Sequence, residues 1–284
     1  MKRLALVLLG SLAAWGVAHA GATARAVRGT AEASMLVTGH VQVNPDGTLK
    51  SYRIDAPEKL PAPVVRLIAN YLPHWKFKLS RPSDHVVDSG MSLRVLARPE
   101  ADHNYALSIE GASFDQTRDP TQKVTAEQRS PPAYPQVAIR ERVSGTVYLL
   151  LQIGRDGTVH DAVAEQVNLD QYGTEQQMER FRKVLAQASL SAARHWVFHV
   201  PSAGPTASDP YWVVRVPVNY SLRHWGELPH RPGYGEWRAY IPGPRDVAPW
   251  ADRRLLSEAP DAMPDGALHE LGGGLRLDTG KSGG

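Results

Sequence analysis

Apolar and polar residues alternate along four stretches of the chain, and this pattern predicts β-strands. A period of two is typical of a strand that buries one face and exposes the other. The alternation runs over residues 37–44 and 91–96 in the first part of the chain, and over 147–153 and 212–220 in the second. A shorter alternating run over 105–109 indicates one additional strand in the first part.

Two short motifs predict that the first strand of each part turns back into a hairpin. Asp46-Gly47 and Asp156-Gly157 end these strands, and return strands are expected over 48–55 and 158–165. Glycine adopts a positive φ without steric cost, which tight hairpin turns require. We therefore interpret the two aspartates as turn residues rather than as acids of a catalytic site.

A helix is expected after each hairpin, because apolar residues recur there at helical spacing. The first opens with prolines at 57–63 and stops near Pro73, and proline is tolerated in a first helical turn. The second begins with Thr174 and Gln177, the spacing of a capping box, and runs to about His195. The expected apolar stripes are Val64, Leu67, Ile68 and Tyr71 in the first helix, and Phe181, Leu185, Ala188 and Ala192 in the second. A short helix is also expected from about Gln136 to Arg142.

The end of each helix carries nearly the same motif, which indicates an internal repeat. His74-Trp75-Lys76-Phe77 recurs as His195-Trp196-Val197-Phe198, 121 positions later. The strands that follow keep the same offset, so Arg94 and Arg215 fall into register. The fold class predicted is α+β, with two tandem units that each pack a helix on a small, mainly antiparallel three-stranded sheet.

The domain organisation follows from the repeat. We predict a first unit over 30–114, a linker over 115–130 and a second unit over 131–222. Residues 223–284 are rich in proline and glycine and are expected to form an irregular tail, whose tryptophans suggest that parts of it pack onto the units.

Residues 1–20 have the features of a secretory signal peptide. Lys2 and Arg3 precede an apolar run over 4–17, and Ala18-His19-Ala20 offers small residues for cleavage after Ala20. The alternative is an uncleaved inner-membrane anchor, but the run is shorter than the roughly 20 residues that a spanning helix needs. A periplasmic location is therefore expected.

Composition excludes several classes of function. The chain has no cysteine, so it has neither disulfides nor cysteine metal ligands. Its net charge of +3 falls to +1 without Lys2 and Arg3, which does not favour nucleic-acid binding. No glycine-rich phosphate loop and no nucleophile elbow is present, so we predict that the protein is not an enzyme and needs no cofactor.

The motif at the helix ends offers two candidate sites, and both have a simpler interpretation. His195 and His199 have a metal-ligand spacing, but they straddle a helix-to-strand junction, and we predict no metal site. Trp75 and Trp196 could stack on a ligand. Together with Phe77 and Phe198 they are more typical of core residues between helix and sheet.

The last strand of the second unit carries a different signal. Pro217 has no N–H, and proline is confined to edges or bulges of sheets. A free edge can accept a strand from another chain. The open alternative is that the tail or the first unit already covers this edge.

The second unit resembles the C-terminal domain of the TonB energy-transducer family. The resemblance covers about 131–222, and a fainter copy covers 35–98. Its motifs are Pro132-Ala133-Tyr134-Pro135, Gly145-Thr146-Val147, Asp156-Gly157-Thr158-Val159, Trp196-Val197-Phe198 and the closing run from Val216 to Leu222.

The resemblance implies a small periplasmic domain whose sheet edge pairs with a peptide of an outer-membrane receptor, with force supplied by an inner-membrane motor during transport. The peptide-binding residues expected on this basis are Val213, Arg215, Pro217 and Asn219. Unlike family members, the chain has no long Pro-rich spacer before the domain, so protein or peptide binding is the part of the implied function that we retain. The alternative is a structural periplasmic module or a homodimer without a role in transport.

Overall fold

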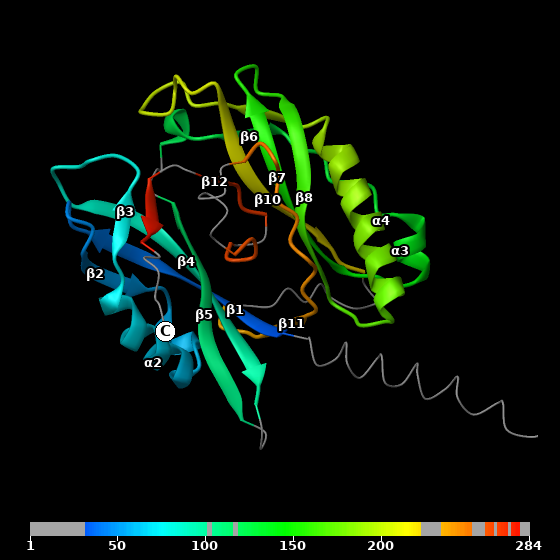
Figure 1. The fold of residues 1–284 in the computed structure, drawn as a ribbon, viewed down its shortest axis with the longest axis horizontal. Coiled ribbons are helices and arrows are strands. Elements are labelled where there is room, and N and C mark those ends of the chain that lie inside the picture. Colours follow the sequence, from blue (N-terminus) through cyan, green and yellow to red (C-terminus); the bar gives the residue numbers. More distant parts are fainter. Residues whose placement is uncertain are drawn as a thin grey trace, which may run out of the picture.

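Two antiparallel sheets face each other, and each carries its helices on the outer side (Figure 1). Part of residues 223–284, called the C-terminal segment below, lies between the two sheets. This computed structural model describes residues 32–100, 104–115, 119–222, 234–251, 259–263, 266–271 and 274–278. The predicted signal peptide lies outside the described residues. The α+β class and the mainly antiparallel sheets agree with the prediction.

The first sheet is built around a long hairpin of neighbouring strands. Its order is β11-β1-β4-β5, where β11 (Arg238–Tyr240) comes from the C-terminal segment, and β2 pairs with the end of β1. Its helix packs on one face, where Val64 and Ile68 join the apolar residues of β1 and β4 in a single core. The elements are β1 (Glu32–Val43), β2 (Leu49–Ile54), η1 (Pro57–Lys59), α2 (Ala62–Tyr71), η2 (Leu72–His74), β3 (Phe77–Leu79), β4 (Val87–Pro99) and β5 (Tyr105–Asp115).

The second sheet has the order β12-β10-β7-β8, where β12 (His269–Leu271) comes from the C-terminal segment. The capping box of its long helix is confirmed, because Gln177 N donates to Thr174 Oγ1 at 3.3 Å and Thr174 N donates to Gln177 Oε1 at 2.9 Å. The elements are η4 (Pro120–Gln122), β6 (Thr125–Gln128), α3 (Gln136–Arg140), β7 (Gly145–Gly154), β8 (Val159–Leu169), α4 (Glu175–Ala193), β9 (Val197–His199) and β10 (Tyr211–Tyr220).

The two hairpin turns make the same contact with the strand that follows the helix. Gly47 has φ +82° and its carbonyl accepts from Phe77 N at 2.8 Å. Gly157 has φ +76° and its carbonyl accepts from Phe198 N, also at 2.8 Å. At either glycine an added Cβ would come within 2.2 Å of the phenylalanine carbonyl oxygen. Only glycine therefore fits both the positive φ and the close approach.

The sheets are wider than the three strands expected for each, because β5 joins the first sheet and the C-terminal segment adds one strand to each. The expectation that this segment is irregular holds only in part, since three short strands form in it. β11 (Arg238–Tyr240) pairs with β1, β12 (His269–Leu271) with β10, and β13 (Leu275–Leu277) with β3. β6, in the stretch expected as a linker, pairs with β9. Backbone groups at a sheet edge need partners, and these short strands supply them.

The C-terminal segment also covers the inner face of the second sheet. Leu150 and Val213 on that face pack with Ala248, Ala251 and Leu271. After β11 the chain passes directly to the second sheet, where Ile241 and Leu169 exchange backbone hydrogen bonds of 2.8 and 3.1 Å. The segment therefore joins the two sheets and separates their facing surfaces.

Candidate functional site

The candidate site is the outer edge of β10. Along its full length, from Tyr211 to Tyr220, β10 pairs with β7. On its other side β12 pairs only with residues Val213–Arg215. Among the described residues no strand pairs with that side from Val216 to Tyr220. Part of the edge is thus occupied by the chain itself and part of it carries no strand.

Pro217 lies in the part of β10 that pairs with β7 and with no second strand of the described residues. It stands opposite Tyr148 of β7 in a continuous register. Proline is tolerated in a strand where its missing N–H would face away from the ladder. Alternate residues of a strand share a direction, so the N–H of Asn219 points to the same outer side. Asn219 itself is exposed, and its Nδ2 donates to Thr146 Oγ1 at 3.3 Å.

The second face of β10, expected to be partly open to water, is exposed at Asn219 but buried at Val213, Arg215 and Pro217. Val213 is 5% exposed, Arg215 is 1% exposed and Pro217 is buried. The physical reason is the C-terminal segment, which packs on this face. Trp212, Val214, Val216 and Val218 on the other face belong to the core with Phe181 and Leu185 of α4, as expected.

Arg215 forms a buried ion pair rather than facing a peptide. Its Nε lies 2.7 Å from Glu165 Oε2 and its Nη2 lies 3.0 Å from Glu165 Oε1. Arg245, from the C-terminal segment, donates through Nε to Glu165 Oε1 at 3.0 Å. A buried carboxylate needs such compensation, since desolvation of an unpaired charge is costly. A role for Arg215 in selecting a peptide, expected from the sequence, therefore does not fit its position.

β12 is held on the edge of β10 by side chains on both of its faces. Leu271, opposite Val213, packs among Leu150, Ala248 and Ala251 on the inner face. Glu270, opposite Val214, accepts a hydrogen bond from the backbone N–H of Val124 at 3.2 Å. Burial, with the nearby charges of Asp209 and Asp115, raises the pKa of Glu270 although this hydrogen bond opposes the shift.

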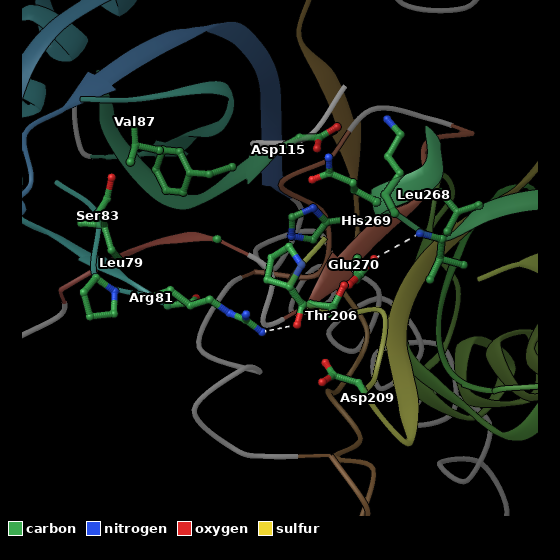
Figure 2. A pocket seen from close by; sticks show the side chains of 18 of the residues that line it. Leu79, Arg81, Ser83, Val87, Asp115, Thr206, Asp209, Leu268, His269 and Glu270 are labelled. Carbon is green, nitrogen blue, oxygen red and sulfur yellow. Dashed lines mark hydrogen bonds between the residues drawn. The ribbon is translucent and has the colours of Figure 1, made fainter. Parts of the chain in front are cut away.

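A cleft of about 540 Å³ lies beside β12, where both sheets and the C-terminal segment meet (Figure 2). Figure 2 shows Glu270, His269 and Asp115 along this cleft, with Asp209 beyond them. Arg81, on the opposite wall, donates through Nη2 to the carbonyl of Pro205. Both acidic and basic side chains line the cleft, so its charge does not favour anionic over cationic ligands.

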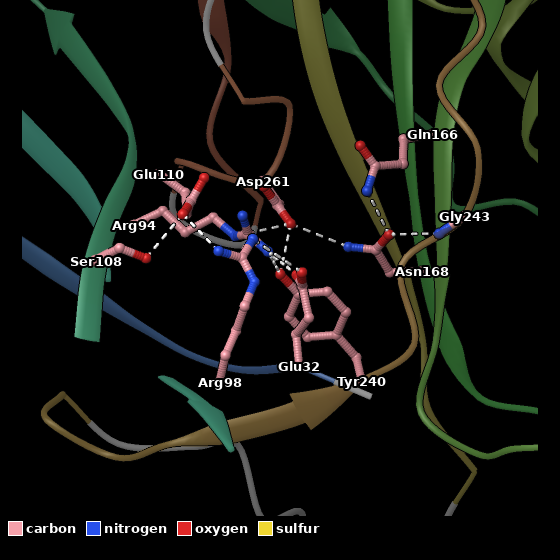
Figure 3. A network of polar contacts seen from close by, with 10 residues as sticks. All are labelled: Glu32, Arg94, Arg98, Ser108, Glu110, Gln166, Asn168, Tyr240, Gly243 and Asp261. Carbon is pink, nitrogen blue, oxygen red and sulfur yellow. Dashed lines mark hydrogen bonds and ion pairs between the residues drawn. The ribbon is translucent and has the colours of Figure 1, made fainter. Parts of the chain in front are cut away.

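A second polar network joins the first sheet, the C-terminal segment and the second sheet (Figure 3). Arg94, 7% exposed, lies 2.7 Å from Glu32 Oε2 and 3.0 Å from Asp261 Oδ2, and it also donates to the Tyr240 hydroxyl. Asp261 accepts from the Tyr240 hydroxyl at 2.7 Å and from Asn168 Nδ2 of β8 at 3.1 Å. One carboxylate of the C-terminal segment therefore contacts both sheets.

The aromatic residues of the repeated motif differ in burial. Phe77, Trp196 and Phe198 are buried, and Trp196 Nε1 donates to the carbonyl of Ser130 at 2.8 Å. Trp75 is half-buried and packs at the margin of its core, with its ring centroid 6.4 Å from that of Phe77. The two tryptophans thus occupy matching places in the chain but differ in how deeply they are buried.

The turn aspartates bind their own turns. Asp46 Oδ1 accepts from Thr48 N at 2.9 Å, and Asp156 Oδ1 accepts from Thr158 N at 3.1 Å. These hydrogen bonds lower the pKa of both carboxyl groups, chiefly through the Thr48 side chain for Asp46 and the Thr158 backbone for Asp156. Both aspartates therefore stabilise their own hairpin turns, which is the role expected from the sequence.

The two histidines of the motif do not converge. His195 Nδ1 lies 3.0 Å from the carbonyl of Ser191, while His199 Nδ1 lies 3.5 Å from Glu127 Oε2. Over the described part of the chain no group of three or more histidine and acidic side chains is placed to hold a metal ion. Nor is any helix there long and apolar enough to cross a membrane.

Several residues of the site were not found from the sequence. No local sequence motif marks Glu165, Arg245 or Glu270. Their partners come from segments that are distant in the sequence. A weak signal for β12 was available in Leu268-His269-Glu270-Leu271, a short apolar and polar run inside a glycine-rich stretch.

The chain is similar to two curated relatives, each named Protein TonB, from two strains of Xanthomonas campestris pv. campestris. It is 29% identical to each over 113 residues, which is 39% of this chain and 40% of the relative. The chain therefore spans about 40% of the length of the curated relatives it matches. No protein-family model matches the chain, and no solved structure matches it significantly. The resemblance to the TonB family inferred from the motifs is confirmed by these relatives.

Proposed function

We propose that this chain is a periplasmic TonB-like protein that binds an extended peptide segment of a partner protein, such as an outer-membrane receptor of a transport system, at the outer edge of β10. The observation that carries the proposal is the stretch from Val216 to Tyr220, which pairs with β7 on one side and with no described strand on the other. Strand addition to such an edge supplies backbone hydrogen bonds for affinity. The role is one of binding and not of catalysis.

Two further expectations belong to this proposal. The first is export with cleavage after Ala20, which intact-mass measurement of the secreted protein tests, since a chain that still begins at Met1 would contradict it. The second is that residues 30–114 and 131–222 are two copies of one TonB-like unit. It is supported by the identical contact of Gly47 with Phe77 and of Gly157 with Phe198.

The binding test titrates labelled peptides from periplasmic segments of outer-membrane receptors into the full chain. Asn219→Pro removes the next N–H on the outer side of β10, whereas Asn219→Ala removes the same side chain and keeps that N–H. Strand addition predicts that the proline variant loses binding and that the alanine variant retains it. Equal binding by both variants, or no binding by the unmodified chain, would reject the proposed function.

A structural module is the second candidate. It is favoured by the C-terminal segment, which pairs with edges of both sheets and fills the space between them. The homodimer suggested by the sequence receives no support from these findings.

A further inference from the structure

We propose that β12 is a tethered ligand of the β10 edge, and that the partner peptide is an extended segment of the same chemistry, aliphatic-x-acceptor-aliphatic, which displaces it. The acceptor is a carboxyl or carboxamide side chain. This inference rests on the proposed function, because it takes the edge of β10 as the place where a foreign strand adds. It goes further by naming the side chains of that strand and its direction.

The direction and register come from the pairing of β12. Its strand runs antiparallel to β10, with Leu271 opposite Val213 and His269 opposite Arg215. A foreign strand that adds in this register continues the same ladder toward Tyr220. It can therefore use the unoccupied stretch from Val216 to Tyr220 together with the stretch that β12 now covers.

The side-chain preference comes from the two faces of β12. Leu271 packs in an apolar cluster with Leu150, Val213, Ala248 and Ala251, with Trp250 beside it. Leu268 packs against the core on the helix side of the second sheet. These two positions are three apart in an extended strand, so they lie on opposite faces. Both sites bury apolar surface and therefore select aliphatic side chains.

The position of Glu270 is recognised by a backbone donor, which takes a side chain with an oxygen acceptor. Glu270 accepts from the N–H of Val124, which immediately precedes β6. A lysine or arginine at this position would leave that donor without its acceptor in a partly buried place, which disfavours basic segments. The three contacts together define the sequence class of the partner.

The experiment opens the edge in the full chain by two independent routes. Leu271→Asp places a charge in the apolar cluster, and His269→Pro removes the N–H that faces Arg215 across the ladder. Leu275→Asp is the matched control, because Leu275 is similarly buried but belongs to β13, which pairs with β3. Hydrogen exchange of the Val213 and Arg215 amides reports whether the edge is open.

The probe is a labelled synthetic peptide with the sequence of residues 266–271, and fluorescence anisotropy measures its binding. Because β12 is tethered and competes at high effective concentration, both opened variants should bind the probe at least roughly tenfold more tightly than the unmodified chain. The Leu275→Asp variant should resemble the unmodified chain. A probe with lysine at the position of Glu270, and a probe of reversed sequence, should bind at least about tenfold more weakly.

Three outcomes would overturn the inference. One is that amides of Val213 and Arg215 stay protected in both variants, since β12 would then not be what covers the edge. Another is that the edge opens and the probe does not bind, and the third is that the lysine or reversed probe binds equally well. If receptor peptides bind the full chain in any of these cases, the proposed function survives and only the tethered-ligand inference fails. If the β12 probe binds and no receptor peptide does, the tethered-ligand inference survives and the proposed binding of receptor peptides fails.

Discussion

Arg94 and Arg215, 121 residues apart and at matching positions of β4 and β10, are both buried in ion pairs with carboxylates between the two sheets. Arg94 reaches Asp261 of the C-terminal segment directly. Arg215 reaches that segment through Glu165, which also binds Arg245. The same position of two strands therefore anchors the same segment at two points.

Removal of Arg215 should destabilise the second sheet strongly. Arg215→Met leaves Glu165 buried with Arg245 as its remaining cation, and loss of one member of a buried pair costs about 3–5 kcal/mol. The double variant Glu165→Met/Arg215→Met should recover most of this loss, because no carboxylate is then left buried and Arg245, whose side chain is 31% exposed, can be hydrated. The free energy of unfolding in urea measures both. A double variant less stable than the single one would contradict this account.

Asp261 should hold the C-terminal segment on both sheets. Asp261→Ala removes the carboxylate that Arg94, Tyr240 and Asn168 share. Amide hydrogens of β11 and of residues 259–263 should then exchange faster, while those of α4 keep their protection. Asp84→Ala is the control, since Asp84 is an exposed aspartate whose only described partner is its neighbour His85.

The pH dependence of stability should report on Glu270. Its pKa is raised above the ordinary value of 4.5, so the folded state holds the proton more tightly than the unfolded state. The contribution of Glu270 to stability is therefore greatest below the ordinary pKa and falls as pH rises through the raised pKa. Glu270→Gln should remove this fall and stabilise the chain at neutral pH, as measured by urea unfolding at a series of pH values. Glu179→Gln, at an exposed position of α4, should leave the fall in place.

The two tryptophans of the repeated motif should differ in the cost of truncation. Trp196 is 3% exposed and makes a hydrogen bond to Ser130, so Trp196→Ala should cost about 3–5 kcal/mol. Trp75→Ala should cost distinctly less, because its ring is only half-buried. Trp196→Phe keeps most of the packing and should cost about 1 kcal/mol more than the packing change alone, for the lost hydrogen bond. Equal losses for the two alanine variants would contradict the difference in burial.

Gly47 and Gly157 should respond alike to alanine. A non-glycine residue at positive φ costs roughly 1–2 kcal/mol, and here the new Cβ also meets a carbonyl oxygen. Gly266→Ala separates the two contributions, since Gly266 has φ +74° and no atom within 4 Å of the added Cβ. Chemical denaturation should give a larger loss for the two hairpin glycines than for Gly266. A similar loss at all three positions would mean that the close contact adds nothing.

Local patterns predicted the elements that depend on local chemistry. The turn of Asp156-Gly157, the capping box of Thr174 and the apolar face of β10 each follow from residues a few positions apart. The pairs of β12 with β10 and of β11 with β1 could not be predicted in this way, because each joins segments that no shared periodicity connects. The burial of Arg215 was missed for the same reason, since an arginine between valines in a strand is also typical of a face open to water.

The pairing of β11 with β1 also constrains the order of folding. On the side away from β4, residues 32–34 pair with residues 238–240, so this part of the first sheet cannot be completed until that distant segment is present. Pairings of such large sequence separation form late and slowly, because a long loop must close first. Until then the edges of β1 and β10 stay available to other strands. The interval before the last segment docks is therefore the time at which this protein is most exposed to misassembly.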